Sequence, residues 1–222
     1  MFIASLTHEL RTPLTILKGR LHAIEDGVID PATGECGRLL EQVDKLLRIT
    51  DALTTLAKAH AGELVLDLRC VDLSRIVAMS VLELRVEAEA SGTGLHEAYQ
   101  EMVVKCDPAR IAQGLGALML FALSLVPPDS SLAIELVSFP ERAVLSLHSP
   151  DWWLGPDEER CLSIPTQGAG SAVNIARSDG GIWPALAGAL FAAHGWQLAI
   201  DHRPNARGRT IVVSCPRLLH AG

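Results

Sequence analysis

Apolar residues recur at helical spacing through the first quarter of the chain. A stripe with steps of three or four residues extends from Ile3 to Ile24, which predicts one helix over about 2–25. Turn-forming residues fill 26–34, and a second apolar series, Leu39 to Leu56, predicts a helix over about 35–60. Each helix of this hairpin covers only one side of the other, so the pattern predicts a homodimer in which two hairpins form a four-helix bundle. The alternative is a monomer whose second domain covers the stripe.

After Ala61-Gly62 the helical pattern stops, and strands and helices alternate without a fixed period. The fold class is therefore α+β, with a helical hairpin over 1–61 and an α/β sandwich domain over 62–222. Strands are predicted over 63–69, 102–106, 132–137, 143–148, 196–201 and 209–214, and helices over 72–90, 107–125 and 181–194.

Composition narrows the classes of partner. The chain has 222 residues and a formal net charge of -7, which argues against nucleic acid as a partner. Its five cysteines form no CxxC pair, which fits a reducing compartment. No signal peptide is visible, and the longest apolar run, 115–126, is shorter than the roughly 20 residues that span a bilayer. We expect a cytoplasmic chain without membrane contact of its own, either a stand-alone protein or the cytoplasmic part of a membrane receptor.

The chemistry of the first helix centres on residues 8–14, which read His-Glu-Leu-Arg-Thr-Pro-Leu. His8 falls off the apolar stripe, so its imidazole is expected to face solvent, and Thr12 follows one helical turn later. An imidazole is neutral and nucleophilic near its unperturbed pKa of about 6.5. A solvent-facing histidine with an adjacent acid and a nearby hydroxyl suits phosphoryl chemistry.

This heptapeptide resembles, residue for residue, the phospho-acceptor box of sensor histidine kinases. The resemblance implies that His8 is the phosphorylated residue, that Glu9 is the acid or base that assists the phosphoryl step, and that Thr12 positions water during dephosphorylation. It also implies a homodimer and a response-regulator receiver domain as partner. The order of elements after residue 62 is similar to the ATP-binding domain of the same kinases.

The second domain departs from that family at the positions expected to hold nucleotide and metal. The resemblance implies asparagines for magnesium on the helix after Asp107-Pro108, an aspartate for adenine at the end of a strand, and glycines near the phosphates. Only the first glycine of the late glycine-rich stretch is kept. The residues at these positions are Ala117, Phe121, Ser149, Asp151, Trp153 and Gly181. We therefore expect no bound ATP, metal or other cofactor, and we expect Trp152 and Trp153 to cap the hydrophobic core.

These features predict a degenerate histidine kinase that has lost its autokinase activity. It would pass phosphoryl groups between His8 and receiver aspartates, or dephosphorylate the regulator with help from Thr12, and it is similar to stand-alone dimeric histidine phosphotransferases. The Mg²⁺ ion is expected on the partner receiver domain. Two alternatives stay open: a functional sensor kinase with an atypical ATP pocket, and a non-catalytic dimeric module that sequesters a response regulator.

Overall fold

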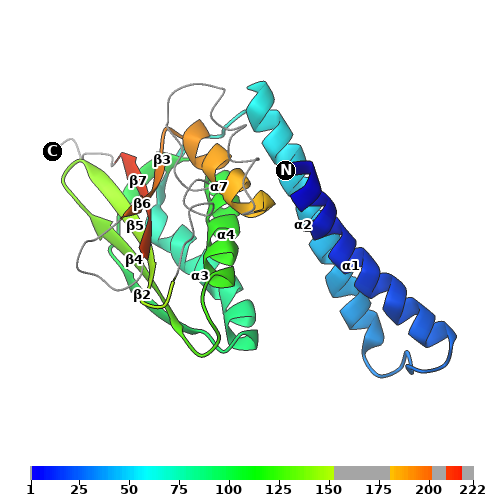
Figure 1. Cartoon of the computed structure of the whole chain (residues 1–222). Helices are drawn as coiled ribbons and strands as arrows, with labels where there is room; N and C mark the ends of the chain where they lie inside the picture. Colours follow the sequence, from blue (N-terminus) through cyan, green and yellow to red (C-terminus); the bar gives the residue numbers. More distant parts are fainter. Residues whose placement is uncertain (1, 153–180, 202–208, 217–222) are drawn as a thin grey trace.

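The structure, a computed structural model, describes residues 2–152, 181–201 and 209–216, with the side chains of 2–6, 8 and 209 outside the described set. The chain forms a long helical hairpin that extends from one side of an α/β unit (Figure 1). The predicted fold class is confirmed: two N-terminal helices precede a layer of helices on a sheet. None of the described helices is long and apolar enough to cross a bilayer.

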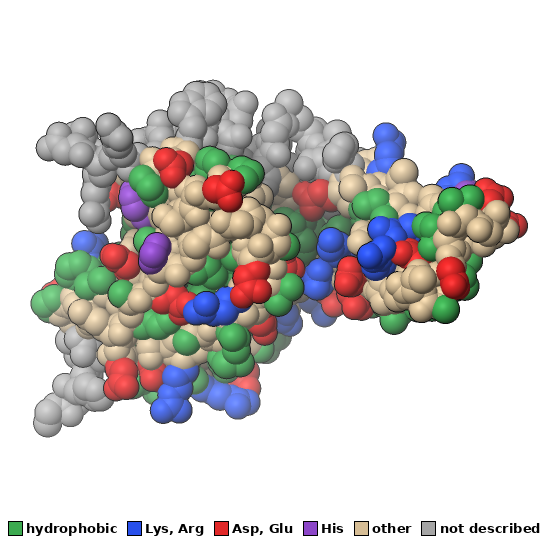
Figure 2. Space-filling view, turned by 90° about the horizontal axis from the view of Figure 1, so that it is seen from below, with side chains coloured by type: hydrophobic (Ala, Val, Ile, Leu, Met, Phe, Trp, Pro, Cys, Tyr) green, Lys and Arg blue, Asp and Glu red, His purple; other side chains and the backbone are tan. Residues whose placement is uncertain are grey.

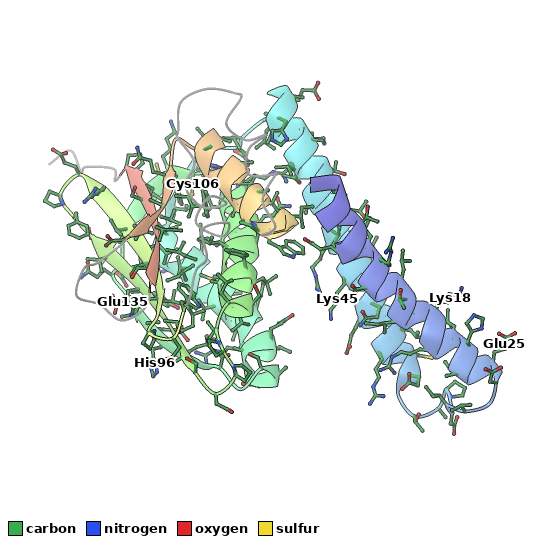
Figure 3. All side chains as sticks on the ribbon, in the orientation of Figure 1. Lys18, Glu25, Lys45, His96, Cys106 and Glu135 are labelled. Carbon is green, nitrogen blue, oxygen red and sulfur yellow. The ribbon has the colours of Figure 1, made fainter. Side chains whose placement is uncertain are left out.

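The hairpin consists of α1 (Phe2–Glu25) and α2 (Glu35–Ala61), close to the predicted bounds. The helix α1 continues through Pro13 without interruption. At the other end of the hairpin, Gly62 closes α2 in the left-handed region at φ 70°, where its N–H bonds to the carbonyl of Ala59. In Figure 3, Lys18 and Lys45 project away from the two helices, in keeping with a polar outer surface.

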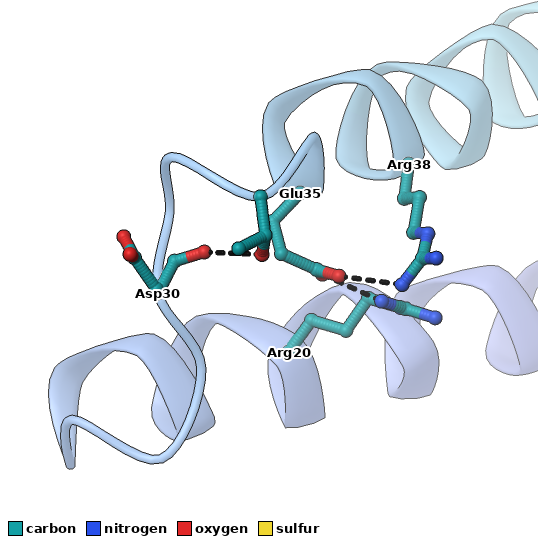
Figure 4. A network of polar contacts seen from close by, with 5 residues as sticks. Arg20, Asp30, Glu35 and Arg38 are labelled. Atoms are coloured by element: carbon teal, nitrogen blue, oxygen red, sulfur yellow. Dashed lines mark hydrogen bonds and ion pairs between the residues drawn. The ribbon is translucent and has the colours of Figure 1, made fainter.

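A buried carboxylate joins the two helices at the base of the hairpin. The side chain of Glu35 accepts a hydrogen bond from Arg20 Nη1 at 2.5 Å and from Arg38 Nη1 at 2.7 Å (Figure 4). The hydrogen bond from Arg20 lowers the pKa of Glu35 more than burial raises it, and Arg38 lowers that pKa further. Arg20 belongs to α1 and Glu35 to α2, so this ionic cluster fixes how the helices leave the turn.

The α/β unit has two layers. Its sheet has the strand order β2-β4-β5-β7-β6, with β2 parallel to β4 and the other neighbours antiparallel. A separate antiparallel pair joins β1 to β3. The strands are β1 (Arg69–Asp72), β2 (Gly94–Tyr99), β3 (Val103–Cys106), β4 (Ser131–Ser138), β5 (Arg142–Ser149), β6 (Gln197–Asp201) and β7 (Arg209–Pro216); the helices are α3 (Leu73–Ala90), α4 (Pro108–Ser124) and α7 (Ile182–Ala193).

The core lies between these helices and the sheet, and Cys106 is among its residues (Figure 3). Its largest fully buried side chains include Leu118 and Met119 from α4, Ile134 and Leu147 from the sheet, and Phe191 from α7. A Cβ placed on Gly114 would approach the ring of Phe191 to 3.1 Å, so α4 and α7 pack closely there.

Two sequence predictions about strands need correction. The strand predicted over 63–69 is wrong, because residues 63–68 have no regular structure and β1 begins only at Arg69. Val65 is 88% exposed, and the N–H of Asp67 bonds to the carboxylate of Asp107 rather than to a neighbouring strand. The strand β2 was not predicted, because it is a polar strand at the edge of the sheet with no fully buried residue.

The hairpin contacts the α/β unit mainly through α7. Leu56 and Ala59 of α2 pack against Ala185 and Ala189 of α7. Other apolar residues of the hairpin are in solvent within one chain: Leu14, Leu21, Leu40, Val43 and Leu47 are all exposed. Figure 2 shows the hairpin, to the right, with green hydrophobic side chains among blue and red charged ones.

The Glu35 cluster predicts an acid-sensitive hairpin. Because the pKa of Glu35 is lowered on folding, its stabilisation is present above about pH 4.3, the usual carboxyl value, and is lost as the pH falls through the lower folded value. We expect Glu35→Gln to lower the melting temperature at neutral pH. The melting temperature of this variant should also change less as the pH falls. Circular dichroism melts between about pH 7 and about pH 3 measure this. The control is Glu25→Gln, because that exposed carboxylate pairs with the exposed His22 of its own helix and does not join α1 to α2. Equal behaviour of both variants contradicts the prediction.

Candidate functional site

The heptapeptide 8–14 lies in the N-terminal half of α1. The backbone of His8 is helical, whereas its side chain lies outside the described residues, so its predicted exposure stays a prediction. Thr12 is exposed, as the apolar pattern predicted, and Glu9 is half-buried. The helix therefore exposes Thr12 one turn beyond the histidine, while the Glu9 carboxylate turns towards α7.

Glu9 makes a contact that the sequence did not predict. Its Oε1 accepts a hydrogen bond from the backbone N–H of Ile182 at 3.0 Å, at the first residue of α7. The preceding residue, Gly181, has φ 79°, and a Cβ placed on it would come well inside 3.0 Å of the same oxygen. The structure thus brings together two of the predicted site residues, Glu9 and Gly181. A backbone N–H carries no side-chain signature, so the sequence could not have identified Ile182.

The two α4 positions expected to be asparagine lie in the core. Ala117 and Phe121 are 3% and 5% exposed and belong to the same buried cluster as Trp152 and Ile182. The indole of Trp152 packs in the core as predicted, while Trp153 lies outside the described residues. Aromatic and aliphatic side chains therefore fill this part of the unit.

Asp107 begins α4 and serves the fold. Its carboxylate accepts hydrogen bonds from the backbone N–H groups of Asp67, Ala109 and Arg110 at 3.0–3.1 Å. Burial raises the pKa of Asp107, but these donors outweigh it, so the pKa lies below its usual range. The Asp107 N–H donates to His194 Nε2 at 3.1 Å, and His194 Nδ1 lies 2.7 Å from the carbonyl oxygen of Leu190.

The end of β5 carries a hydroxyl at the position where the resemblance implied a carboxylate. Ser149 is fully buried, and its Oγ lies 3.4 Å from the backbone nitrogen of Asp151. The carboxylate of Asp151 is exposed and accepts a hydrogen bond from the Ser130 hydroxyl at 2.5 Å. In the neighbouring strand, the buried Thr210 meets His148 Nδ1 at 3.2 Å, a pair with no recognisable sequence signal.

Metal-ligating side chains do not gather in the described part of the chain. Within residues 2–152, 181–201 and 209–216, no group of three or more His, Cys, Asp or Glu side chains could hold a metal ion. Two cysteines of the core, Cys106 and Cys215, have pKa values raised by burial to about 11 and about 12, so both thiols stay protonated near neutral pH.

Comparison with known proteins gives matches over most of the chain. Residues 1–62 match the family model of the His Kinase A (phospho-acceptor) domain. The histidine protein kinase DivJ of Caulobacter vibrioides is 26% identical over 226 residues, which cover 98% of this chain and 37% of DivJ. The chain spans between 28% and 46% of the length of DivJ and three other curated relatives.

Solved structures share the fold. The Acinetobacter baumannii histidine kinase AdeS has a TM-score of 0.71 at 22% identity, over 96% of this chain and 98% of the AdeS chain. The histidine kinase ThkA, in a crystal structure with the response regulator protein TrrA, has a TM-score of 0.61 at 15% identity, over 97% of this chain and 60% of that chain. At these identities the structures show a common fold.

The burial of Phe121 predicts a role in packing. We expect Phe121→Ala to lower the free energy of unfolding by about 3–5 kcal/mol, because it leaves a cavity beneath α4. The control Leu82→Ala removes a side chain that is 56% exposed, and it should change that free energy by no more than about 0.5 kcal/mol. Chemical denaturation measures both variants. A loss below about 1 kcal/mol for Phe121→Ala would mean that the ring lines an open pocket.

Proposed function

Because the chain belongs to the sensor histidine kinase family, we propose that it passes phosphoryl groups between His8 and the aspartates of response-regulator receiver domains. The heptapeptide 8–14 carries this proposal, since it lies on α1 inside the matched phospho-acceptor domain. Thr12 is exposed one turn beyond His8, and its hydroxyl is a group that can orient water for dephosphorylation.

The transfer step needs little from the protein beyond a positioned imidazole. A neutral ring nitrogen of His8 attacks phosphorus, and an N–P bond forms as the P–O bond to the receiver aspartate breaks and the aspartate leaves as a carboxylate. The ring then carries positive charge, which an adjacent carboxylate, Glu9, can stabilise or relieve by accepting a proton. In the phosphatase reaction, a water held by Thr12 attacks the aspartyl phosphate instead, and inorganic phosphate leaves.

We propose that ATP is not the phosphoryl donor. Magnesium takes hard oxygen ligands, and neither Ala117 nor Phe121 has an oxygen in its side chain. Both are packed in the core, and the buried Ser149 offers a neutral hydroxyl in place of the expected adenine-binding carboxylate. The Mg²⁺ ion that phosphoryl transfer requires would come with the receiver domain. A functional sensor kinase is the second candidate, favoured by the matched relatives that are themselves named histidine kinases.

A receiver domain fits as the partner for two reasons. The ThkA structure contains a response regulator protein, and the chain shares its fold with that kinase over 97% of its length. The site also requires an acyl phosphate as donor or an aspartate as acceptor, and a receiver supplies both. The non-catalytic alternative, a dimer that sequesters a regulator, uses the same partner but does not need His8, Glu9 and Thr12.

The phosphotransfer proposal is tested with labelled phosphate. The parent protein is offered Mg-ATP in one reaction and a phosphorylated receiver domain in another, and label on His8 is measured. We expect labelling from the receiver and none from ATP. His8→Ala should abolish transfer, whereas Thr12→Ala should keep transfer and slow only dephosphorylation of the receiver. The free energy of unfolding of each variant should stay within about 0.5 kcal/mol of the parent's, because surface substitutions rarely cost more.

Each result of that experiment selects one reading. Label on His8 from ATP selects the functional kinase and rejects the ATP-independent reading. Transfer that survives His8→Ala rejects the phosphotransfer reading altogether. If the receiver domain binds but no label appears on His8 in any protein, the result supports the non-catalytic dimer that sequesters a regulator.

We also propose that the protein is a homodimer through the hairpin. The exposed apolar residues of α1 and α2 form stripes at helical spacing, and burial of apolar area contributes about 25 cal/mol per Å². Light scattering should give about twice the chain mass of 23.8 kDa. Leu47→Asp should produce monomer or aggregate. The control Leu82→Asp alters an equally exposed leucine on α3 and should stay dimeric; a single-chain mass for the parent rules the dimer out.

A further inference from the structure

The helix α7 lacks a cap of its own. The first N–H groups of a helix have no partner inside it and form its positive end. Gly181, the N-cap residue, has no side-chain acceptor, and the first turn of α7 contains no acid. Glu9 supplies the missing acceptor from α1, through the hydrogen bond from Ile182 N–H at 3.0 Å. A carboxylate 173 positions away in the chain therefore caps this helix.

The backbone at Gly181 is shaped around that carboxylate. Its φ of 79° lies in the region that favours glycine, and any Cβ there would overlap Glu9 Oε1. Glycine is therefore favoured here for two reasons, the positive φ and the closeness of Glu9 Oε1. The second reason applies only while Glu9 is hydrogen-bonded to Ile182. We call the Glu9 carboxylate, Gly181 and the Ile182 N–H the Glu9 latch.

Two other contacts between the hairpin and the α/β unit, one with α4 and one with α7, are easier to separate. The nearby polar contact, Gln113 Nε2 to Thr55 Oγ1, is neutral and 3.4 Å long. The apolar contact of Leu56 and Ala59 falls on the small side chains of Ala185 and Ala189. A hydrogen bond to a charged group is about twice as strong as a neutral one, so the Glu9 latch is the strongest single polar contribution among these three contacts.

We propose that the Glu9 latch holds the α/β unit closed against the phospho-acceptor helix, and that phosphotransfer through His8 requires the latch to open. This inference rests on the proposed function of His8. While Glu9 caps α7, the acid expected to assist the phosphoryl step is engaged elsewhere. The Glu9 oxygen that accepts the Ile182 N–H is held at the first turn of α7 and is not available to another donor in the same geometry.

The closed state also limits approach to the box. Glu9 and Leu10 are half-buried, and Leu10 packs against the core of the α/β unit. The unit therefore covers the side of α1 that directly adjoins His8. Opening would free the Glu9 carboxylate and uncover this side for a receiver domain. Loss of a hydrogen bond to a charged group shifts such an equilibrium by roughly tenfold or more.

The chain offers a matched pair of variants for the test. Gly181→Ala places a methyl group against Glu9 and leaves residues 8–14 unchanged. Gly195→Ala makes the same substitution at the other end of α7, at φ 71°, where a Cβ meets nothing within 4 Å. Both variants strain a left-handed glycine, but only the first disturbs the latch.

Opening is measured as a distance between spin labels. Cys36 on the hairpin and Cys70 in β1 are exposed, whereas Cys106 and Cys215 are buried. Cys161 is changed to serine in every protein compared, and labelled chains are diluted with unlabelled ones so that each dimer carries one labelled chain. We expect Gly181→Ala to raise the open population roughly tenfold and to speed transfer from a phosphorylated receiver by a similar factor. Gly195→Ala should change neither quantity.

Glu9→Ala provides a second route if Gly181→Ala fails to fold. It should open the same distance distribution, and only the distance is used for this variant because Glu9 belongs to the proposed phosphotransfer site. If Gly181→Ala and Glu9→Ala both give the same distance distribution as Gly195→Ala, the Glu9 latch does not hold the two parts closed. If the distances open but transfer is no faster, the latch does not gate the reaction. No label on His8 in any protein, despite open distances, refutes the proposed function rather than the latch.

Discussion

The burial of α7 on two sides is the constraint on which the arrangement of the molecule depends. Nine of the ten positions from Ile182 to Phe191 are buried, Trp183 being the exception, and none of the ten is charged. A helix that is apolar all round needs cover on every side. The sheet and α4 cover one side and α2 covers the other, so α7 lies between the hairpin and the rest of the α/β unit (Figure 1).

The predictability of the fold followed the strength of local patterns. The hairpin was predicted almost to the residue, because its leucines keep one period over six turns and loop residues interrupt it only once. Asp107-Pro108 marked α4 in the same way, since the aspartate caps the helix and proline suits its first turn. The alternation of Leu64, Leu66 and Leu68 misled, because alternation indicates an extended backbone and not the presence of a partner strand.

In the candidate site, too, local features were predictable from the sequence and tertiary contacts were not. The residue types of the box and the losses at Ala117, Phe121 and Ser149 are visible in the sequence, because they are properties of single positions. The hydrogen bond between Glu9 and Ile182 depends on how two helices that are far apart in the sequence pack together, and its donor is a backbone N–H. The packing of Phe121 against its neighbours in the core depends on the tertiary structure and could not be predicted from its position alone.

The ionic cluster at Glu35 gives the hairpin a mechanical property. Arg20 and Glu35 clamp α1 to α2 at the turn, so α1 is anchored at one end and can move more at the other. With a rise of about 1.5 Å per residue, Glu9 lies about 17 Å along the helix from Arg20. A tilt of about 10° around the clamp would displace Glu9 by about 3 Å, which is enough to break a hydrogen bond. A small rotation of α1 about the ion pair therefore produces a larger displacement at the point where α1 contacts α7.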